Sequence, residues 1–432
     1  MNSKLRFVSV LLLFAVVLVA GSSFRPVGAG AGSTASLMQA ADTDWWPTFH
    51  HDLAHSGYST STAPETNQTL WSYNTGEAVY PSPAVYDGVV YVGSYDNRTY
   101  ALNASTGVQV WNYTTGGPVV SSPAVGGGVV YIGSDDYNLY ALNVTTGAKV
   151  WNYTTGNEVE SSPAVANGVV FVGSDDRQVY ALNATTGTKV WNFTTGTDAY
   201  SSPAVANGVV YTGSDDTNVY ALNASTGAMI WYYETGGIVE SSPAVANGLV
   251  YVGSYDNRTY ALNATTGMQV WNYTTGWFVV SSPAVANGIV YVGSRDGNVY
   301  ALDAMTGNLV WNYTTGLAGA PGQVYSSPGV SDGVVYVDSF DDNIYALNTT
   351  TGMLVWKYKT GGYMWSSPAV VNGVVYVGSL DDKVYAFGPS PTIPEFPSTL
   401  ILSVFTVTTI MTALVLKRKR ARSSQGHMCQ LA

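Results

Sequence analysis

The chain has 432 residues, of which only 10% are charged, and its formal net charge is −11 at pH 7. Lys4, Arg6 and the five basic residues between positions 417 and 422 lie near the ends, which leaves ten Lys and Arg against twenty-eight Asp and Glu in between, a formal charge of −18. So acidic a body excludes nucleic acid as a partner. Cys429 is the only cysteine, so the chain cannot form an internal disulfide.

Residues 1–21 predict an export signal. Lys4 and Arg6 precede an apolar run from Phe7 to Ala20, and small residues follow. The alternative is an uncleaved N-terminal anchor, although the run is short for a membrane span. Residues 22–44 are rich in Gly, Ala and Ser and predict a flexible leader. Either interpretation places the repeat domain that follows outside the cytoplasm.

The segment from Asp44 to Asp52 is rich in aromatic residues and histidines. His51 and His55 are four residues apart, so on one helical turn they could share a metal ion. The preferred interpretation is that this segment packs over one end of the domain that follows, and no metal site is expected.

A unit of about forty residues then repeats almost unchanged. Each copy contains four short runs of strand-forming residues separated by Asn-Gly, Asp and Thr-Gly turns, which is typical of a propeller blade. The repeated tryptophans are Trp71, Trp111, Trp151, Trp191, Trp231, Trp271, Trp311 and Trp356.

The repeated elements are offset from one another. Ser-Pro-Ala/Gly-Val occurs eight times between Ser82 and Ser367, whereas the tryptophan series starts one element earlier and stops one element earlier. The last copy therefore lacks its outer strand, and the run from Thr69 to Tyr73 is an outer strand that precedes the first copy and belongs to none. Pairing the two closes a ring without a free edge. The sequence predicts an all-β domain over residues 45–388: an eight-bladed β-propeller of four-stranded antiparallel blades, its last blade closed by an N-terminal strand.

Residues 389–397 are rich in proline and predict a stiff spacer. Residues 398–416 carry no charge and are long enough for one C-terminal transmembrane helix. The basic residues of the tail, 417–432, place it in the cytoplasm. The expected localisation is therefore the extracellular side of the plasma membrane, single-pass anchored.

The stretch from Ala101 to Trp111 resembles the tryptophan-docking motif of the PQQ-like (quinoprotein alcohol dehydrogenase-like) propeller family: Ala, Asp or Asn, Thr-Gly and Trp at fixed spacing, in seven copies. The resemblance implies that the eight repeated tryptophans wedge against neighbouring blades. Members include PQQ-dependent dehydrogenases, in which the quinone lies against a ring of disulfide-bonded adjacent cysteines with calcium beside it, and the propeller lipoprotein of the bacterial outer-membrane assembly machinery. This chain lacks such cysteines, so no cofactor is expected, and PQQ with calcium is the alternative.

The run Pro394-Glu395-Phe396-Pro397, followed by the apolar span and the basic cluster, resembles the PEF-type sorting signals of archaeal surface proteins. The resemblance implies an archaeal source and a membrane archaeosortase as a partner. The ten residues beyond Arg422 are longer than such signals usually carry, which leaves processing open.

Asn-x-Ser/Thr sequons recur and predict an N-glycosylated exterior. The alternative is that Asn and Thr recur because turns favour them. The sequons are Asn67, Asn97, Asn103, Asn112, Asn143, Asn152, Asn183, Asn192, Asn223, Asn257, Asn263, Asn272, Asn312 and Asn348.

The repeats differ mainly just before each Ser-Ser-Pro. If the strands of a blade are lettered A to D from the axis outward, these D-to-A connections lie at one mouth of the central channel. Aromatic and acidic groups around a concavity suit a glycan, a cationic ligand or a protein loop; the alternative is unselected drift at loop tips. The predicted ligand-binding residues are Tyr80, Glu160, Tyr200, Glu240, Trp277, Tyr325, Tyr363 and Trp365, with Val120 and Val280 completing the ring.

Each B-to-C turn carries an invariant aspartate that we expect to fix the turn, with calcium capture as the alternative. These residues are Asp96, Asp136, Asp176, Asp216, Asp256, Asp296, Asp341 and Asp381. The sequence contains no catalytic triad or phosphate loop. It predicts a non-enzymatic cell-surface propeller for binding, adhesion or envelope scaffolding, whose partner is a surface glycan or a protein. The alternatives are a PQQ-dependent oxidoreductase and an envelope protein-assembly factor.

Overall fold

The computed structural model describes residues 44–64, 66–316 and 322–389. The predicted export signal, nearly all of the leader, the transmembrane segment, the sorting motif and the tail lie outside the described residues. Within these ranges, no helix has the length and apolar character needed to cross a membrane.

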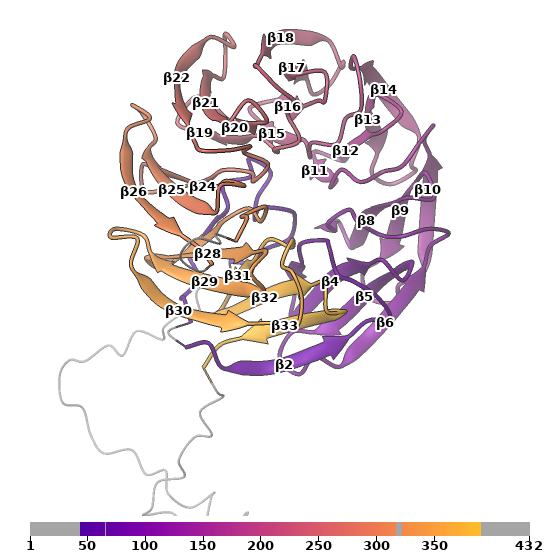
Figure 1. Ribbon diagram of the computed structural model, residues 1–432. Helices are drawn as coiled ribbons and strands as arrows, with labels where there is room; N and C mark the ends of the chain where they lie inside the picture. The colour runs from indigo at the N-terminus through magenta and orange to yellow at the C-terminus, as the bar shows by residue number, and fades with distance from the viewer. Residues whose placement is uncertain (1–43, 65, 317–321, 390–432) are drawn as a thin grey trace, which may run out of the picture. The chain divides into compact units, whose positions relative to one another are not determined.

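Eight sheets are arranged around a central channel, and each contains an antiparallel meander of four strands, A to D, counted outward from the axis (Figure 1). This confirms the predicted eight-bladed propeller. The A strands are β3 (Ala84–Tyr86), β7 (Ala124–Gly126), β11 (Ala164–Ala166), β15 (Ala204–Ala206), β19 (Ala244–Ala246), β23 (Ala284–Ala286), β27 (Gly329–Ser331) and β31 (Ala369–Val371). The B strands are β4 (Val89–Ser94), β8 (Val129–Ser134), β12 (Val169–Ser174), β16 (Val209–Gly213), β20 (Leu249–Ser254), β24 (Ile289–Gly293), β28 (Val334–Ser339) and β32 (Val374–Ser379). The C strands are β5 (Arg98–Asn103), β9 (Asn138–Asn143), β13 (Gln178–Asn183), β17 (Asn218–Asn223), β21 (Arg258–Asn263), β25 (Asn298–Asp303), β29 (Asn343–Asn348) and β33 (Lys383–Phe387). The D strands are β6 (Gln109–Thr114), β10 (Lys149–Thr154), β14 (Lys189–Thr194), β18 (Met229–Glu234), β22 (Gln269–Thr274), β26 (Leu309–Thr314), β30 (Leu354–Lys359) and β2 (Thr69–Asn74).

The D strand of blade eight is β2, which comes from the N-terminal part of the propeller. It pairs antiparallel with β33, and Trp71 lies opposite Ala386 (Figure 1). The preceding residues also replace the C-to-D turn that blade eight lacks, because Trp356 Nε1 donates to the carbonyl of Pro64 at 3.0 Å. The predicted closure of the ring by an N-terminal strand is therefore confirmed.

The repeated tryptophans dock each blade onto the next. Trp71 Nε1 donates to the carbonyl of Ala104 at 2.8 Å, and its ring covers Gly107 of the next C-to-D turn. Gly107 has a φ of +69°, and a Cβ built there would lie 2.7 Å from the indole. The turn thus needs glycine both for its backbone conformation and for the close approach of the ring.

A second close approach lies on the B strands, where a Cβ on Gly93 would meet Val119 Cγ1 of the next blade at 2.2 Å. Glycine occupies this position in seven blades, whereas blade seven has Asp338. The Asp338 side chain is fully buried, and neither carboxyl oxygen has a hydrogen-bond partner. Burial raises its pKa well above the usual range.

The segment 44–64, which we call the belt, follows the inner edge of the ring. Its carbonyls accept hydrogen bonds at 2.6–2.8 Å from the central valine N–H of six A strands, as Trp46 does from Val85 and Leu53 from Val205. Within the belt, β1 (Tyr58–Ser59) adds a parallel strand to β27. The Asp44 carboxylate accepts from the N–H and hydroxyl of Thr60, which joins the start of the belt to its end. The inner edge strands are thereby covered.

Candidate functional site

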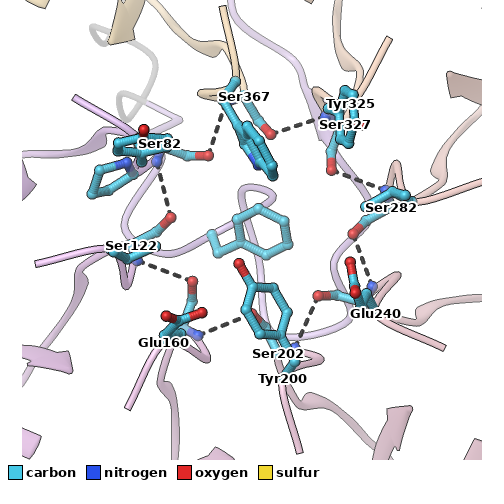
Figure 2. A pocket seen from close by; sticks show the side chains of 18 of the residues that line it. Ser82, Ser122, Glu160, Tyr200, Ser202, Glu240, Ser282, Tyr325, Ser327 and Ser367 are labelled. Carbon is cyan, nitrogen blue, oxygen red and sulfur yellow. Dashed lines mark hydrogen bonds between the residues drawn. The ribbon is translucent and has the colours of Figure 1, made fainter. Parts of the chain in front are cut away.

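A cavity of about 390 Å³ occupies the D-to-A end of the channel. We call it the cup. Phe49 of the belt lines it, and most of its wall consists of the residues before each A strand (Figure 2). Its lining is Phe49, Tyr80, Pro81, Tyr95, Val120, Glu160, Tyr200, Glu240, Val280, Tyr325, Trp365 and the eight serines Ser82, Ser122, Ser162, Ser202, Ser242, Ser282, Ser327 and Ser367.

The eight serines form a closed ring of hydrogen bonds between blades (Figure 2). In each case the backbone N–H of one serine donates to the Oγ of the serine in the next blade, at 2.9–3.1 Å, and Ser367 closes the ring onto Ser82. Ser-Ser-Pro-Ala-Val is one of the four strand-forming runs of each copy, but the A strand begins only after the proline, so the run is not a strand over its first three residues. Their backbone bonds run sideways to the neighbouring blade, and proline has no N–H for a ladder.

The belt segment beneath the cup is not helical. His50, His51 and His55 have positive φ values of 57°, 78° and 54°. His51 Nε2 bonds Asp44 at 3.0 Å, while burial lowers the pKa of His50 to about 4 and that of His55 to about 3. The alternative of a metal shared on one helical turn therefore lacks its geometric premise, and the segment packs over the channel as expected.

One side of the cup is acidic. Glu160, Tyr200 and Glu240 come from three successive D-to-A connections, and Figure 2 shows the Tyr200 hydroxyl directed toward the axis between the two carboxyls. Burial raises the pKa of Glu160 to about 7, and the charge of Asp135 adds to the shift. Burial also raises the pKa of Glu240, although Tyr255 donates to it at 2.7 Å. These carboxyls are held in surroundings that disfavour their charge.

Three more carboxyls surround this side from the B-to-C turns. Burial raises the pKa of Asp175 to about 7, and the neighbouring charge of Glu160 contributes. Burial raises the pKa of Asp135 and of Asp215 to about 6, with contributions from nearby glutamates. In all three aspartates Oδ1 is buried without a hydrogen-bond partner. The neighbours that shift the pKa values of these three aspartates are all acidic, and no Lys, Arg or His is among them.

The opposite side of the cup is aromatic. The Trp365 ring lies 4.6 Å from Tyr325 and 5.9 Å from Tyr80, measured between ring centroids. Behind them, Phe340 stacks on Tyr325 at 4.3 Å. The Arg295 guanidinium lies 5.0 Å from the Tyr325 ring centroid. The cup thus has one anionic wall and one wall of ring faces.

Of the eight predicted ligand-binding residues, the structure brings six into the lining, together with Val120 and Val280. Trp277 and Tyr363 are not part of it. Trp277 is 42% exposed and lies against Arg295, and Tyr363 is 55% exposed and stacks on Phe340. Trp277 lies three residues before the lining residue Val280, and Tyr363 lies two residues before the lining residue Trp365, so both are outside the cavity lining.

A second variable position was missed by the sequence reasoning. It follows the serine of each B-to-C turn, and its backbone N–H bonds the D-to-A connection, as Asp175 does to the Glu158 carbonyl at 3.1 Å. The signal was available, because this residue varies beside an invariant aspartate. The residues are Tyr95, Asp135, Asp175, Asp215, Tyr255, Arg295, Phe340 and Leu380.

The invariant aspartates act within the turns. Asp96 Oδ2 accepts from the Tyr100 hydroxyl at 2.6 Å and from the Gly76 N–H at 2.9 Å. In the described part of the chain, no group of three or more His, Cys, Asp or Glu side chains could hold a metal ion.

Most of the sequons lie on D strands or in C-to-D turns, while Asn97 and Asn257 lie in B-to-C turns and Asn67 precedes β2. Asn112 and its counterparts on the D strands are exposed. Asn103, in a C-to-D turn, accepts from the N–H and hydroxyl of Thr106 at 3.0 and 2.9 Å. Asp303 makes the equivalent bonds to Thr306 in a copy that is not a sequon. The Oδ1 atom of Asn or Asp can therefore stabilise the C-to-D turn equally, so the recurrence of Asn has a structural explanation. Glycosylation stays a prediction.

The fold and the docking tryptophans define a PQQ-like repeat β-propeller. A family profile described as outer membrane protein assembly factor BamB (PQQ_2) matches residues 56–161, 119–200, 156–238, 234–328 and 316–390. The chain belongs to this family. A comparison with curated protein sequences finds no match.

Similar solved structures include both assembly factors and dehydrogenases. The structure of BamB from Moraxella catarrhalis has 20% identity and a TM-score of 0.66, and covers 74% of this chain and 99% of its own. A europium-containing methanol dehydrogenase has 15% identity and a TM-score of 0.67, with 80% and 98% coverage. Quinohemoprotein alcohol dehydrogenase from Comamonas testosteroni has 17% identity and a TM-score of 0.65, with 82% coverage of both chains. At these identities the likeness concerns the fold alone.

The cup fits PQQ poorly. The quinone is a tricarboxylic acid, and the nineteen lining residues include two glutamates and no Lys, Arg or His. Its carboxylates would face Glu160 and Glu240 without a cationic partner in the lining, and like charges at close range repel.

Proposed function

We propose that this protein is a non-enzymatic binding protein of the cell surface, tethered through residues 398–416, that takes its ligand into the cup. The observation that carries the proposal is the cup, a concavity with a floor, a rigid serine ring and a wall of unlike residues. Elsewhere the repeats are nearly identical, so this wall is where the chain differs most from blade to blade. Ligand sites are typically concave, largely apolar and equipped with a few converging polar groups.

The direction of the chain supports an outward-facing site. The C strand β33 ends at Phe387 at the C-to-D end of the propeller, and the cup lies at the D-to-A end. The predicted spacer and membrane segment follow β33. Tethered in this way, the cup opens away from the membrane, toward ligands in the surroundings.

The test is thermal unfolding of the purified protein with surface polysaccharides, small organic cations, and PQQ with calcium. A ligand that binds only the folded state raises the melting temperature. At a ligand concentration about one hundred times Kd, it adds about 2.7 kcal/mol to the free energy of unfolding. We expect one class of probe to produce a shift that Trp365→Ala removes. Tyr232→Ala is the matched control, since Tyr232 is an exposed aromatic residue on β18, outside the cup.

Two results would replace the proposal. A shift with PQQ and calcium, accompanied by dye-linked dehydrogenase activity, would make the protein an oxidoreductase. Equal shifts of the wild type and the Trp365 variant with every probe would remove the cup as the binding site. In that case, recovery of a specific membrane protein by pull-down would support an envelope-assembly role.

A further inference from the structure

The geometry of the cup points to a small organic cation, carrying an alkylammonium group, as the ligand. We infer that the cation sits above Phe49, between the carboxyls of Glu160 and Glu240 and the Trp365 ring. This inference rests on the proposed function, because it names the ligand class of the same site.

The first argument is charge. Two glutamates line the cavity from blades three and five, and the lining contains no basic residue. Behind them, Asp135, Asp175 and Asp215 each keep a buried oxygen without a hydrogen-bond partner. Arg295 partly offsets the charge of Glu240, whereas no cation contributes to the pKa shifts of Glu160, Asp135, Asp175 and Asp215. A cation on this side of the cup would relieve their mutual repulsion, and an anion would strengthen it.

The second argument is the ring faces. Phe49, Tyr325 and Trp365 all line the cavity, and the Trp365 ring centroid lies 4.6 Å from that of Tyr325. Faces of aromatic rings attract cations, and aromatic cages are the usual receptors of quaternary ammonium groups. The protein already makes this interaction at the rim, where the Arg295 guanidinium lies 5.2 Å from the Trp277 ring centroid and 5.0 Å from that of Tyr325.

The third argument is the kind of cation. An inorganic ion such as calcium prefers six to eight oxygen ligands, and the lining offers two carboxyls separated by Tyr200. Ring faces contact alkyl groups better than they contact a hydrated metal ion. A cavity of about 390 Å³ also has room for an alkylammonium compound.

The experiment is calorimetric titration of the full-length protein with choline and with 3,3-dimethylbutan-1-ol, which has the same shape without the charge. We expect choline to bind at least about tenfold more tightly than the alcohol, a difference of about 1.4 kcal/mol. Glu160→Gln and Trp365→Leu should each weaken choline binding about tenfold. Glu234→Gln is the control, because Glu234 is an exposed glutamate on β18 outside the cup.

The pH dependence gives a second readout. Choline keeps its charge at every pH, so any change reflects the carboxyls facing Glu160, which are Asp135, Glu158, Asp175 and Glu240. Choline binding should strengthen about tenfold between pH 5 and pH 8 as Glu160, Asp175 and Asp135 ionise, because burial raises their pKa values to about 7, 7 and 6. Glu160→Gln should flatten the profile even if Trp365→Leu fails to fold.

The outcomes separate the two claims. Equal binding of choline and the neutral alcohol would overturn the cation inference. Binding of a neutral saccharide instead of choline, lost in Trp365→Leu, would overturn the inference and leave the proposed function standing. Responses to every probe that are identical in the wild type and both cup variants would overturn both.

Discussion

Replacing Asp338 by glycine should stabilise the propeller. Asp338 stands in blade seven where the other blades have glycine, its side chain is fully buried, and its two oxygens lack partners. The position faces the next blade, where Met364 occupies the place of the valine that would meet a Cβ on Gly93. Because methionine is unbranched and flexible, its side chain can fill the space that the carboxyl leaves.

The size of the effect follows from two opposing contributions. A buried polar group without a hydrogen bond costs about 1–3 kcal/mol. Glycine in a strand loses about 0.5–1 kcal/mol through backbone entropy. The net gain is about 0–2.5 kcal/mol while the carboxyl is neutral in both states. Burial raises the pKa of Asp338 in the folded protein, so above about pH 4 the unfolded chain releases a proton that the folded chain keeps. The wild type therefore loses up to about 1.4 kcal/mol per pH unit, until the folded pKa is reached, and the variant does not.

The assay compares thermal unfolding of wild type, Asp338→Gly and Asp338→Asn at pH 4 and pH 7. The glycine variant should melt higher at both values, with a larger difference at pH 7. The asparagine variant cannot titrate, so it should gain relative to wild type only as the pH rises. Other groups titrate in all three proteins and cancel in the comparison. A glycine variant that is equally stabilised at both pH values, or destabilised at both, would show that the carboxyl has a partner and that the reasoning is wrong.

Three further predictions concern packing and the belt. Gly267→Ala should destabilise the fold by several kcal/mol, because the added Cβ would lie 2.7 Å from the Trp231 ring. The control is Gly248→Ala, which has a similar φ of +77° and open space around it and should cost about 1 kcal/mol. Denaturant titration measures both losses, and equal losses would contradict this account. Burial lowers the pKa of His55 to about 3 in the folded protein, so below pH 6.5 the unfolded chain binds a proton that the folded chain does not bind. The free energy of unfolding of the wild type should therefore fall by about 1.4 kcal/mol per pH unit through His55. His55→Gln should reduce that slope, and an unchanged slope would exclude His55 as its source. Trp46→Ala should cost about 3–5 kcal/mol by chemical unfolding because Trp46 is fully buried under the ring, and a loss below about 1 kcal/mol would mean that the belt is dispensable.

The architecture could be predicted from the sequence because it depends on local, repeated signals. Turns every few residues, a forty-residue period and the offset of the tryptophans relative to Ser-Pro-Ala-Val together require eight blades and an N-terminal closing strand. The short A strands could not be predicted in the same way. Ser82 and its counterparts look like strand residues in isolation, and only the closed ring shows that their N–H groups bond to the neighbouring blade.

The site was predictable in part. Variation before each Ser-Ser-Pro identified Glu160, Tyr200 and Trp365, since residues that differ within a monotonous repeat stand out. Asp175 and Arg295 were not predicted as site residues, because the invariant aspartate that follows each of them is the more regular feature of the turn. The packing of the segment around Phe49 over one end of the propeller was predicted, but the place of Phe49 in the lining of the cup was not, because it follows from the path of the belt around the inner edge.

The belt also acts as a gauge of the number of blades. Nearly identical repeats can be gained or lost by unequal recombination, and a repeat domain whose units contact only their neighbours tolerates such changes. Here a segment of fixed length joins its own ends through Asp44 and Thr60 after offering successive carbonyls to the A strands. A ring of seven or nine blades would change the path length that this segment follows between Asp44 and Thr60, and with it the register of the six bonds to the A strands. The length of the belt therefore matches a ring of this circumference, whereas the sequences of the individual copies are free to diverge.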